Sequence, residues 1–414
     1  MSLRLLRSLL GLFLLAPLLA AQEDAAAHLR RARSYEQAGK RAEARTEYEA
    51  ALRLDPGLLE ARIRLGLLLL DLKQADQARQ LLEGPAQSAS AETLLAIGAA
   101  YLRAGLLEDA QRHLEHASRL APELPRVDLL LGQVYSARRL YPAAVERLQR
   151  AVRKEPADPQ AHYLLGVTWN LAGEKEKALG DLEKASRLAP ESAVFAYYLG
   201  LAYLDLGRTA DAARVLDQAV RLDPSDANAR LNLGWALINL GRNREAQEHL
   251  AAVLALRPRD AVACFLLGES QRRLGESDAA VIRFTQALEL DGRMVDALFS
   301  RGTVYYLRQD KEKARADYER LLAVDPRHAG GHYQLGKLLL ALGEIEAGAA
   351  HLKTSVEVEP GNKAAHYQLA RAYRQLGKPE EARREAALFR SLGVEAQDDA
   401  SWRRDPLERR PPKP

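Results

Sequence analysis

The 414-residue sequence predicts an all-α protein, an α-solenoid of helix-turn-helix repeats. Similar stretches recur at a spacing of 34 residues, as from Gly166 to Gly200 and on to Gly234. Each stretch contains two runs of apolar residues at helical spacing. A glycine separates the two runs in most units, and a proline usually follows the second. A fixed period of this length is typical of stacked repeats, in which neighbouring units bury one continuous core.

Residues 193–226 show how one unit is specified. Gly207 lies between the two expected helices, where a left-handed residue would end the first helix, and Pro224 follows the second. Gly200 is small enough to let the two helices approach closely. The apolar residues of both helices recur at helical spacing: Leu199, Tyr203 and Leu206 in the first, and Ala212, Leu216, Ala219 and Val220 in the second.

The register of this unit holds along nearly the whole chain. Lys73, Arg139 and Gln309 stand where the other units have the turn glycine. The small slot of the first helix recurs in eleven units, as Ala32, Gly66, Gly98, Gly132, Gly166, Gly200, Gly234, Gly268, Gly302, Gly336 and Ala370.

The pattern L-G-x-x-Y appears as Leu131-Gly132 with Tyr135 and as Leu199-Gly200 with Tyr203. Three later positions complete the pattern: an alanine, a large apolar residue four positions after it, and a proline. With these residues the sequence resembles the tetratricopeptide repeat family over about residues 25–396. The resemblance implies a right-handed superhelical α-solenoid of about eleven helix-turn-helix tetratricopeptide repeats, in which the first helices line a concave groove.

Residues 1–21 have the pattern of a secretory signal peptide. Arg4 and Arg7 precede an apolar run that ends in small residues before Glu23. The run is shorter than the roughly 20 residues that a comfortable membrane span needs. We therefore expect cleavage, no stable membrane span afterwards, and a periplasmic or extracellular protein of bacterial type. An uncleaved anchor is the alternative.

The one break in register follows the second unit. Gly66 and Gly98 are 32 residues apart, and Pro85 falls inside the expected second helix, which should stop near Glu83. Residues 84–90 form either a hinge or the end of a merely shortened helix. The expected segments are 1–21 (signal peptide), 22–90 (units one and two), 91–396 (units three to eleven) and 397–414 (disordered C-terminal tail).

The composition argues against several classes of function. The chain has 60 Lys and Arg against 56 Asp and Glu, mixed along its length, so no basic stripe predicts nucleic-acid binding. It has no phosphate-binding glycine loop and no hydrolase or zinc-protease motif. The histidines follow the repeat and Cys264 is alone, which favours structural roles and predicts no metal and no cofactor. An enzyme is not expected.

The residues expected to line the groove are aromatic and amide side chains on first helices. Rings supply buried area to a bound peptide and amides bond its backbone. Packing between repeats is the alternative role for the same rings, and Trp235 is the residue that departs most from the repeat pattern. The predicted groove residues are Tyr163, Tyr197, Tyr198, Asn228, Asn232, Trp235, Phe265, Phe299, Tyr306, Tyr333 and Tyr367.

Together these features favour a non-catalytic protein-protein interaction scaffold, exported to the cell envelope, that binds extended peptide segments or partner proteins in the groove. A polysaccharide-binding or export and assembly factor is the alternative, with the rings stacking on sugars. End-to-end self-association is a third reading, because Leu388, Phe389 and Leu392 lie on the last expected helix with no polar cap after them.

Overall fold

The computed structural model describes residues 24–84 and 89–392 of the chain. The predicted signal segment, the predicted tail at 397–414 and most of the 84–90 segment lie outside these ranges. Within them all regular structure is helical, which confirms the all-α prediction. The chain divides into two units, Met1–Leu188 and Ala189–Pro414.

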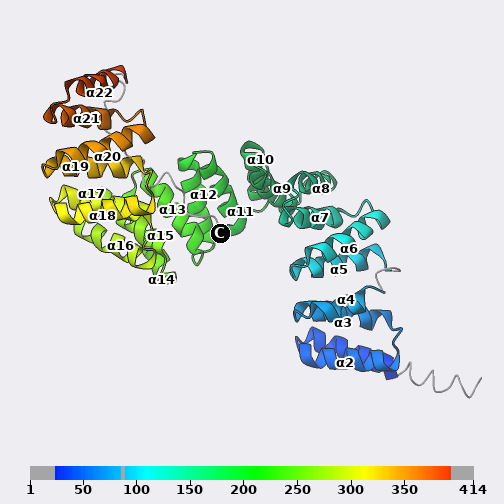
Figure 1. Cartoon of the computed structure of the whole chain (residues 1–414). Helices are drawn as coiled ribbons and strands as arrows, with labels where there is room; N and C mark the ends of the chain where they lie inside the picture. The colour runs from blue at the N-terminus through cyan, green and yellow to red at the C-terminus, as the bar shows by residue number, and fades with distance from the viewer. Residues whose placement is uncertain (1–23, 85–88, 393–414) are drawn as a thin grey trace, which may run out of the picture. The chain divides into compact units, whose positions relative to one another are not determined.

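The first unit begins with a helix over residues 24–37 and continues as helix pairs (Figure 1). Its further helices are α2 (Arg41–Leu54), α3 (Leu59–Asp71), α4 (Ala75–Leu82), α5 (Ala91–Arg103), α6 (Leu107–Leu120), α7 (Pro125–Ala137), α8 (Tyr141–Lys154), α9 (Pro159–Leu171) and α10 (Lys175–Leu188).

The described part of the second unit, residues 189–392, contains six such pairs. Its helices are α11 (Ala193–Asp205), α12 (Thr209–Leu222), α13 (Ala227–Asn239), α14 (Asn243–Leu256), α15 (Ala261–Arg273), α16 (Ser277–Leu290), α17 (Val295–Leu307), α18 (Lys311–Val324), α19 (Ala329–Ala341), α20 (Ile345–Val358), α21 (Lys363–Gln375) and α22 (Pro379–Ser391).

Within each unit the helices pack in chain order. In the second unit, for example, α13 packs against α14, and α14 packs against α15, the first helix of the next pair. Consecutive first helices such as α13 and α15 also contact each other. The first helices of a unit therefore form one continuous layer, and this layer is the surface on which neighbouring pairs present side chains together.

Small residues make the contact inside a pair possible. A methyl group built at Gly200 would lie 2.6 Å from Leu216 Cγ, and one at Gly268 would lie 2.8 Å from two ring carbons of Phe284. Real carbon atoms do not approach so closely, so the large residue of the second helix occupies the space that glycine leaves. This explains why the small slot persists through the sequence.

The turns inside the pairs have the predicted left-handed residue. Gly207 has φ +71°, and the three residues that replace glycine adopt the same conformation, with φ 61° at Lys73, 61° at Arg139 and 64° at Gln309. The chain geometry of the repeat therefore holds even where the sequence does not supply glycine, at a conformational cost to those residues.

Prolines begin or stop helices where the sequence predicts. Pro159 and Pro379 are the first residues of α9 and α22, where a missing amide hydrogen costs nothing. The helix before Pro85 ends at Leu82, so that α4 has 8 residues while α2 has 14. The predicted stop near Glu83 is confirmed.

Histidines form part of the structural framework. The Nδ1 atom of His162 lies 2.9 Å from Asp181 Oδ1, across the pair from α9 to α10. Its Nε2 atom lies 3.2 Å from the carbonyl oxygen of Pro156, and the equivalent His366 makes the same two contacts with Glu385 and Pro360. These contacts tie each pair to the loop before it, as a structural role predicts.

Candidate partner-binding face

The structure places every predicted groove residue on a first helix. Tyr163 lies on α9 in the first unit, and the other ten lie on α11, α13, α15, α17, α19 and α21 in the second. The predicted position on first helices is confirmed. The expectation that these slots are exposed is only partly right. Tyr163, Tyr198, Asn228 and Tyr306 are partly exposed and Tyr367 is 42% exposed, but the remaining six are buried, namely Tyr197, Asn232, Trp235, Phe265, Phe299 and Tyr333.

Two of the buried rings have a clear packing role. The ring of Phe265 lies 6.0 Å from that of Phe284 in the same helix pair. The ring of Phe299 lies 6.4 Å from Tyr318 and 5.6 Å from His328. Phe265 and Phe299 thus fill the core of their pairs, and the prediction that they are exposed groove residues is wrong in this respect.

The amide side chains on α13 make hydrogen bonds within the protein. Asn232 Nδ2 donates to the carbonyl oxygen of Asn228 at 2.9 Å, one helical turn earlier. The Asn228 Oδ1 atom accepts from Arg257 Nη1 at 2.8 Å. Both amides therefore have structural partners, which weakens their predicted role as donors and acceptors to a bound peptide backbone.

A charged cluster lies on α15, in the first-helix layer of the second unit. The side chain of Glu269 is fully buried, and Arg272 Nη2 donates to its Oε2 atom at 2.8 Å. Arg272 Nε lies 3.1 and 3.2 Å from the two carboxylate oxygens, so the contact is forked. Arg273 Nε lies 4.0 Å from Glu269 Oε2. Spacings of three and four residues put both arginines on the same helix face as the carboxylate.

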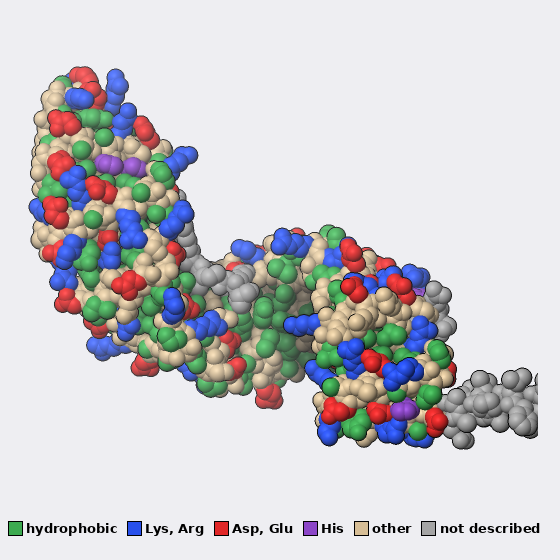
Figure 2. Space-filling model, turned by 60° about the horizontal axis from the view of Figure 1, so that its bottom comes forward, with side chains coloured by type: hydrophobic (Ala, Val, Ile, Leu, Met, Phe, Trp, Pro, Cys, Tyr) green, Lys and Arg blue, Asp and Glu red, His purple; other side chains and the backbone are tan. Residues whose placement is uncertain are grey.

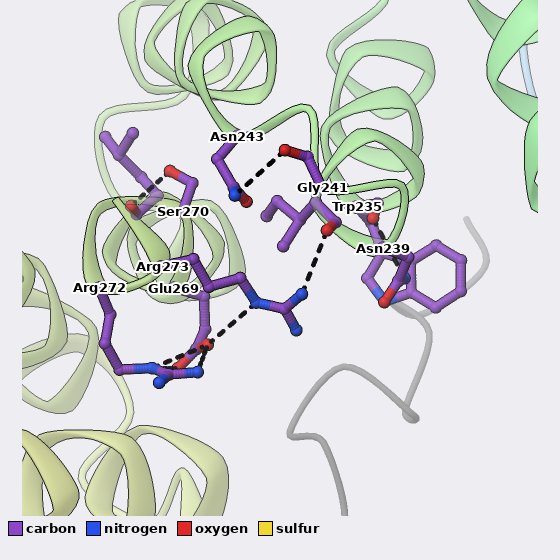
Figure 3. Close-up of polar contacts among 10 residues, drawn as sticks. Trp235, Asn239, Gly241, Asn243, Glu269, Ser270, Arg272 and Arg273 are labelled. Carbon is purple, nitrogen blue, oxygen red and sulfur yellow. Dashed lines mark hydrogen bonds and ion pairs between the residues drawn. The ribbon is translucent and has the colours of Figure 1, made fainter. Parts of the chain in front are cut away.

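The cluster is linked to the neighbouring first helix. Arg273 Nη1 donates to the carbonyl oxygen of Ile238 on α13 at 3.2 Å. Beside it, Asn239 Nδ2 donates to the carbonyl oxygen of Trp235 at 3.2 Å. Figure 3 shows Glu269, Arg272 and Arg273 gathered at α15, with the Arg273 guanidinium reaching toward α13. These contacts hold both guanidinium groups in fixed directions.

The next two first helices extend this polar and aromatic surface. Lys337 Nζ on α19 lies 5.2 Å from the ring centre of Tyr306 on α17 and 5.9 Å from that of Tyr333. Burial raises the pKa of the Tyr306 hydroxyl, so this side chain stays neutral at physiological pH. Lys337 therefore joins the rings of Tyr306 and Tyr333 into one contact group across α17 and α19.

Sequence reasoning from consensus slots did not single out Glu269, Arg272 and Arg273. The signal lay in a comparison between units, because the slots of Glu269 and Arg272 hold Trp235 and Ile238 one unit earlier. One unit later the same two slots hold Thr303 and Tyr306, so neither neighbouring unit repeats the charged pair.

Residues 24–84 and 89–392 contain no group of three or more His, Cys, Asp or Glu side chains placed to hold a metal ion. Cys264 is buried, and burial raises the pKa of its thiol. Figure 2 shows basic and acidic side chains interspersed over the face in view. Within the same ranges, no helix has both the length and the apolar character to cross a bilayer.

Three family models, each described as a tetratricopeptide repeat, match the sequence. One matches residues 3–131, a second matches 129–193 and 265–329, and a third matches 203–263 and 339–403. The matches are spread along nearly the whole chain. No curated protein is similar enough to the sequence to count as a match.

The chain also matches solved structures, some of which are described as tetratricopeptide repeat proteins. The chain is 23% identical to YrrB, described as a tetratricopeptide repeat protein with an unusual peptide-binding site, over 43% of this chain and 92% of YrrB, with a TM-score of 0.41. It is 20% identical to a repeat protein from Parabacteroides merdae, over 60% of this chain and 98% of that one, with a TM-score of 0.48. The APC/C hetero-tetramer Cut9-Hcn1 matches at 17% identity over 93% of this chain and 76% of the other, with a TM-score of 0.47.

Proposed function

Because the chain belongs to the tetratricopeptide repeat family, whose fold generally serves as a non-catalytic scaffold for protein interactions, we propose that it binds extended segments of partner proteins. The binding surface is the first-helix layer of the second unit, centred on α13, α15 and α17. We further propose that the protein works in the cell envelope after export through its N-terminal signal.

The observation that supports this surface is the buried carboxylate with its two arginines. Burying Glu269 costs free energy that its arginine partners return only in part, and apolar side chains at such positions usually stabilise a protein as well or better. The preceding unit has Trp235 and Ile238 at the slots of Glu269 and Arg272. A stability requirement therefore does not explain the charged set, whereas recognition of a partner does.

The test is capture of partners by the mature full-length chain from envelope extracts, followed by amide hydrogen exchange of the complex. We expect captured proteins to protect α13, α15 and α17 from exchange. Replacing the partly exposed ring of Tyr306 with alanine should weaken binding about fivefold or more, because truncated anchor residues commonly cost over 1 kcal/mol. Ile282→Ala, which shortens a side chain that is 58% exposed on α16, is the matched control and should leave affinity unchanged.

Other outcomes would contradict the proposal. Protection confined to α22 would favour self-association through the chain end. Retention of glycans without proteins would favour the polysaccharide-binding alternative. Export is tested separately by the N-terminus of the mature protein, which should follow Ala20 or Ala21.

A further inference from the structure

The pair of α19 and α20 contains a contact between two imidazole rings. His332 Nδ1 on α19 lies 2.9 Å from His351 Nδ1 on α20, and the ring centres are 5.2 Å apart. Three other pairs of the described chain have a histidine at the slot of His332, and in each of them it contacts a carboxylate of the second helix. These contacts are His28 with Glu47, His162 with Asp181 and His366 with Glu385. His351 therefore stands where these three pairs have an acid.

The hydrogen bonds of the two rings determine where their hydrogens lie. His332 Nε2 lies 3.0 Å from the carbonyl oxygen of Pro326, and a carbonyl oxygen only accepts, so this Nε2 atom carries a hydrogen. The Nδ1 atom of neutral His332 is then without a hydrogen and accepts from the Nδ1–H group of His351. A single hydrogen thus joins the two rings, and this bond requires that His332 stay neutral.

Protonation affects this contact differently from the contacts with an acid. A protonated imidazole has an N–H group on both nitrogens. For His162, both groups have an acceptor, namely the carboxylate of Asp181 and the carbonyl oxygen of Pro156. When His332 takes up a proton at Nδ1, its new N–H group faces the N–H group of His351, and the bond between the rings is lost. Two positively charged rings at this distance also repel each other.

The surroundings of His351 oppose its protonation. Burial, and next the adjacent His332, lower the pKa of His351. On α18, Arg315 acts in the same direction and Glu319 opposes it, but Glu319 also accepts a hydrogen bond of 2.8 Å from Arg315. The other helices next to this pair carry charged groups that are already paired, namely Arg301 of α17 with Asp317 of α18 and His366 of α21 with Glu385 of α22.

The same pair has a weak point in helix propensity. Gly348 on α20 occupies the small slot of the second helix, and glycine disfavours a helix interior relative to alanine. The other second helices of this unit have alanine at the slot, as Ala212, Ala246, Ala280, Ala314 and Ala382. Loss of one interhelical contact should therefore open α19 and α20 more readily than a pair with alanine.

We propose that the contact between His332 and His351 is an acid-sensitive latch, closed at neutral pH and opened when both rings become protonated. An unfolded histidine takes up a proton below a pH of about 6.5, and the closed latch cannot hold a proton on both rings. The latch therefore stabilises the pair above this pH, and its contribution is lost as the pH falls below it. Because helices pack in chain order, opening would uncouple α21 and α22 from the rest of the second unit. This inference goes beyond the proposed function and does not depend on it.

The experiment measures amide hydrogen exchange of the full-length chain at pH values of about 7.5 and about 5.5, on either side of the pKa of an unperturbed histidine. Each rate is divided by the intrinsic rate at the same pH, which gives the opening equilibrium of each helix. We expect the opening constant of α19 and α20 to rise about tenfold or more at the lower pH, because each proton bound on opening contributes about tenfold per pH unit. Protection in α11 and α12, which contain no histidine, should stay unchanged.

Two variants assign the effect to the latch. His351→Glu restores the contact that His366 makes with Glu385, so the fold should be retained and the rise in opening at low pH should disappear. Asp181→His makes the opposite change and should introduce acid-induced opening in α9 and α10, where His162 loses its carboxylate. Circular dichroism at neutral pH checks the fold of both variants.

Three results would overturn the inference. The first is unchanged opening of α19 and α20 in the original chain at low pH. The second is an equal rise in the His351→Glu variant, which would assign the effect to other groups. The third is an equal loss of protection in α11 and α12, which would show a general effect of acid on the second unit instead of a local latch.

Discussion

His113 is a buried imidazole on α6 whose environment opposes protonation. Its ring stacks on Tyr101 at 5.3 Å, with 3° between the ring planes. Burial is the largest cause, helped by the positive charges of Arg112 and His116 and opposed by Asp109, and together they lower the pKa of His113 to about 4. An unfolded histidine has a pKa of about 6.5.

As the pH falls, the unfolded chain therefore binds a proton at this residue at a higher pH than the folded chain does. The free energy of unfolding should fall as the pH drops from about 6.5 toward about 4, and should be independent of His113 above that window. Urea unfolding at several pH values across this range measures the change in the free energy of unfolding. His113→Phe keeps a ring against Tyr101 and should lose less stability on acidification. An identical decline in the variant would mean that other groups, such as His249 and His351, account for the effect.

Single residues are also where the sequence was least informative. The position of Trp235 on a first helix could be predicted from the period, but its burial could not, because exposure depends on side chains from other elements. The cluster of Glu269 with Arg272 and Arg273 was missed for a related reason. Its three residues lie within five positions of one another, yet its significance depends on the link to α13 that only the packed structure supplies.

The turns between paired helices give a prediction at the scale of the element. Gln309 connects α17 to α18 with φ 64°, a conformation that costs a residue with a side chain about 1 kcal/mol or more. Gln309→Gly should raise the free energy of unfolding by about 0.5–1 kcal/mol, after allowance for the greater freedom of glycine in the unfolded chain. Chemical denaturation measures the difference.

The matched control is the reverse change at Gly275, which has φ 81° and open space around the position of an added side chain. Gly275→Gln should lower stability by a similar amount through conformation alone. If neither change alters stability, the left-handed turns do not carry the expected strain.

Helices and turns of this kind were predictable from sequence, because their signals are local residues at a fixed period.

At the scale of the whole molecule, packing between successive helices should confine damage to a region. Arg301 on α17 makes a forked ion pair with Asp317 on α18, at 2.9 and 2.7 Å, and both side chains are largely buried. Arg301→Ala leaves the carboxylate buried without this partner and should destabilise the region by about 3–5 kcal/mol. Hydrogen exchange should show lost protection in α17 and α18, with α2–α6 unchanged.

An exposed pair provides the comparison. Arg221 and Asp217 form an ion pair on α12 with side chains 65% and 42% exposed, so Arg221→Ala should cost less than about 1 kcal/mol. Loss of protection throughout the chain in the Arg301 variant would contradict the expectation that the damage stays within one region.

The solenoid class itself was predictable from the sequence, since the period covers nearly the whole chain. The boundary between the two units, after residue 188, could not be predicted, because the register of the repeats is unbroken there.

The order of packing described above also determines how each unit responds to tension. Because a helix pair contacts mainly the pairs before and after it, a pulling force on the ends of a unit passes through every pair in series. Each pair bears the full load, and the weakest yields first. Its neighbours then lose one packing partner and become the next to give way, so that a unit lengthens stepwise and shortens again by restacking on the pairs that remain.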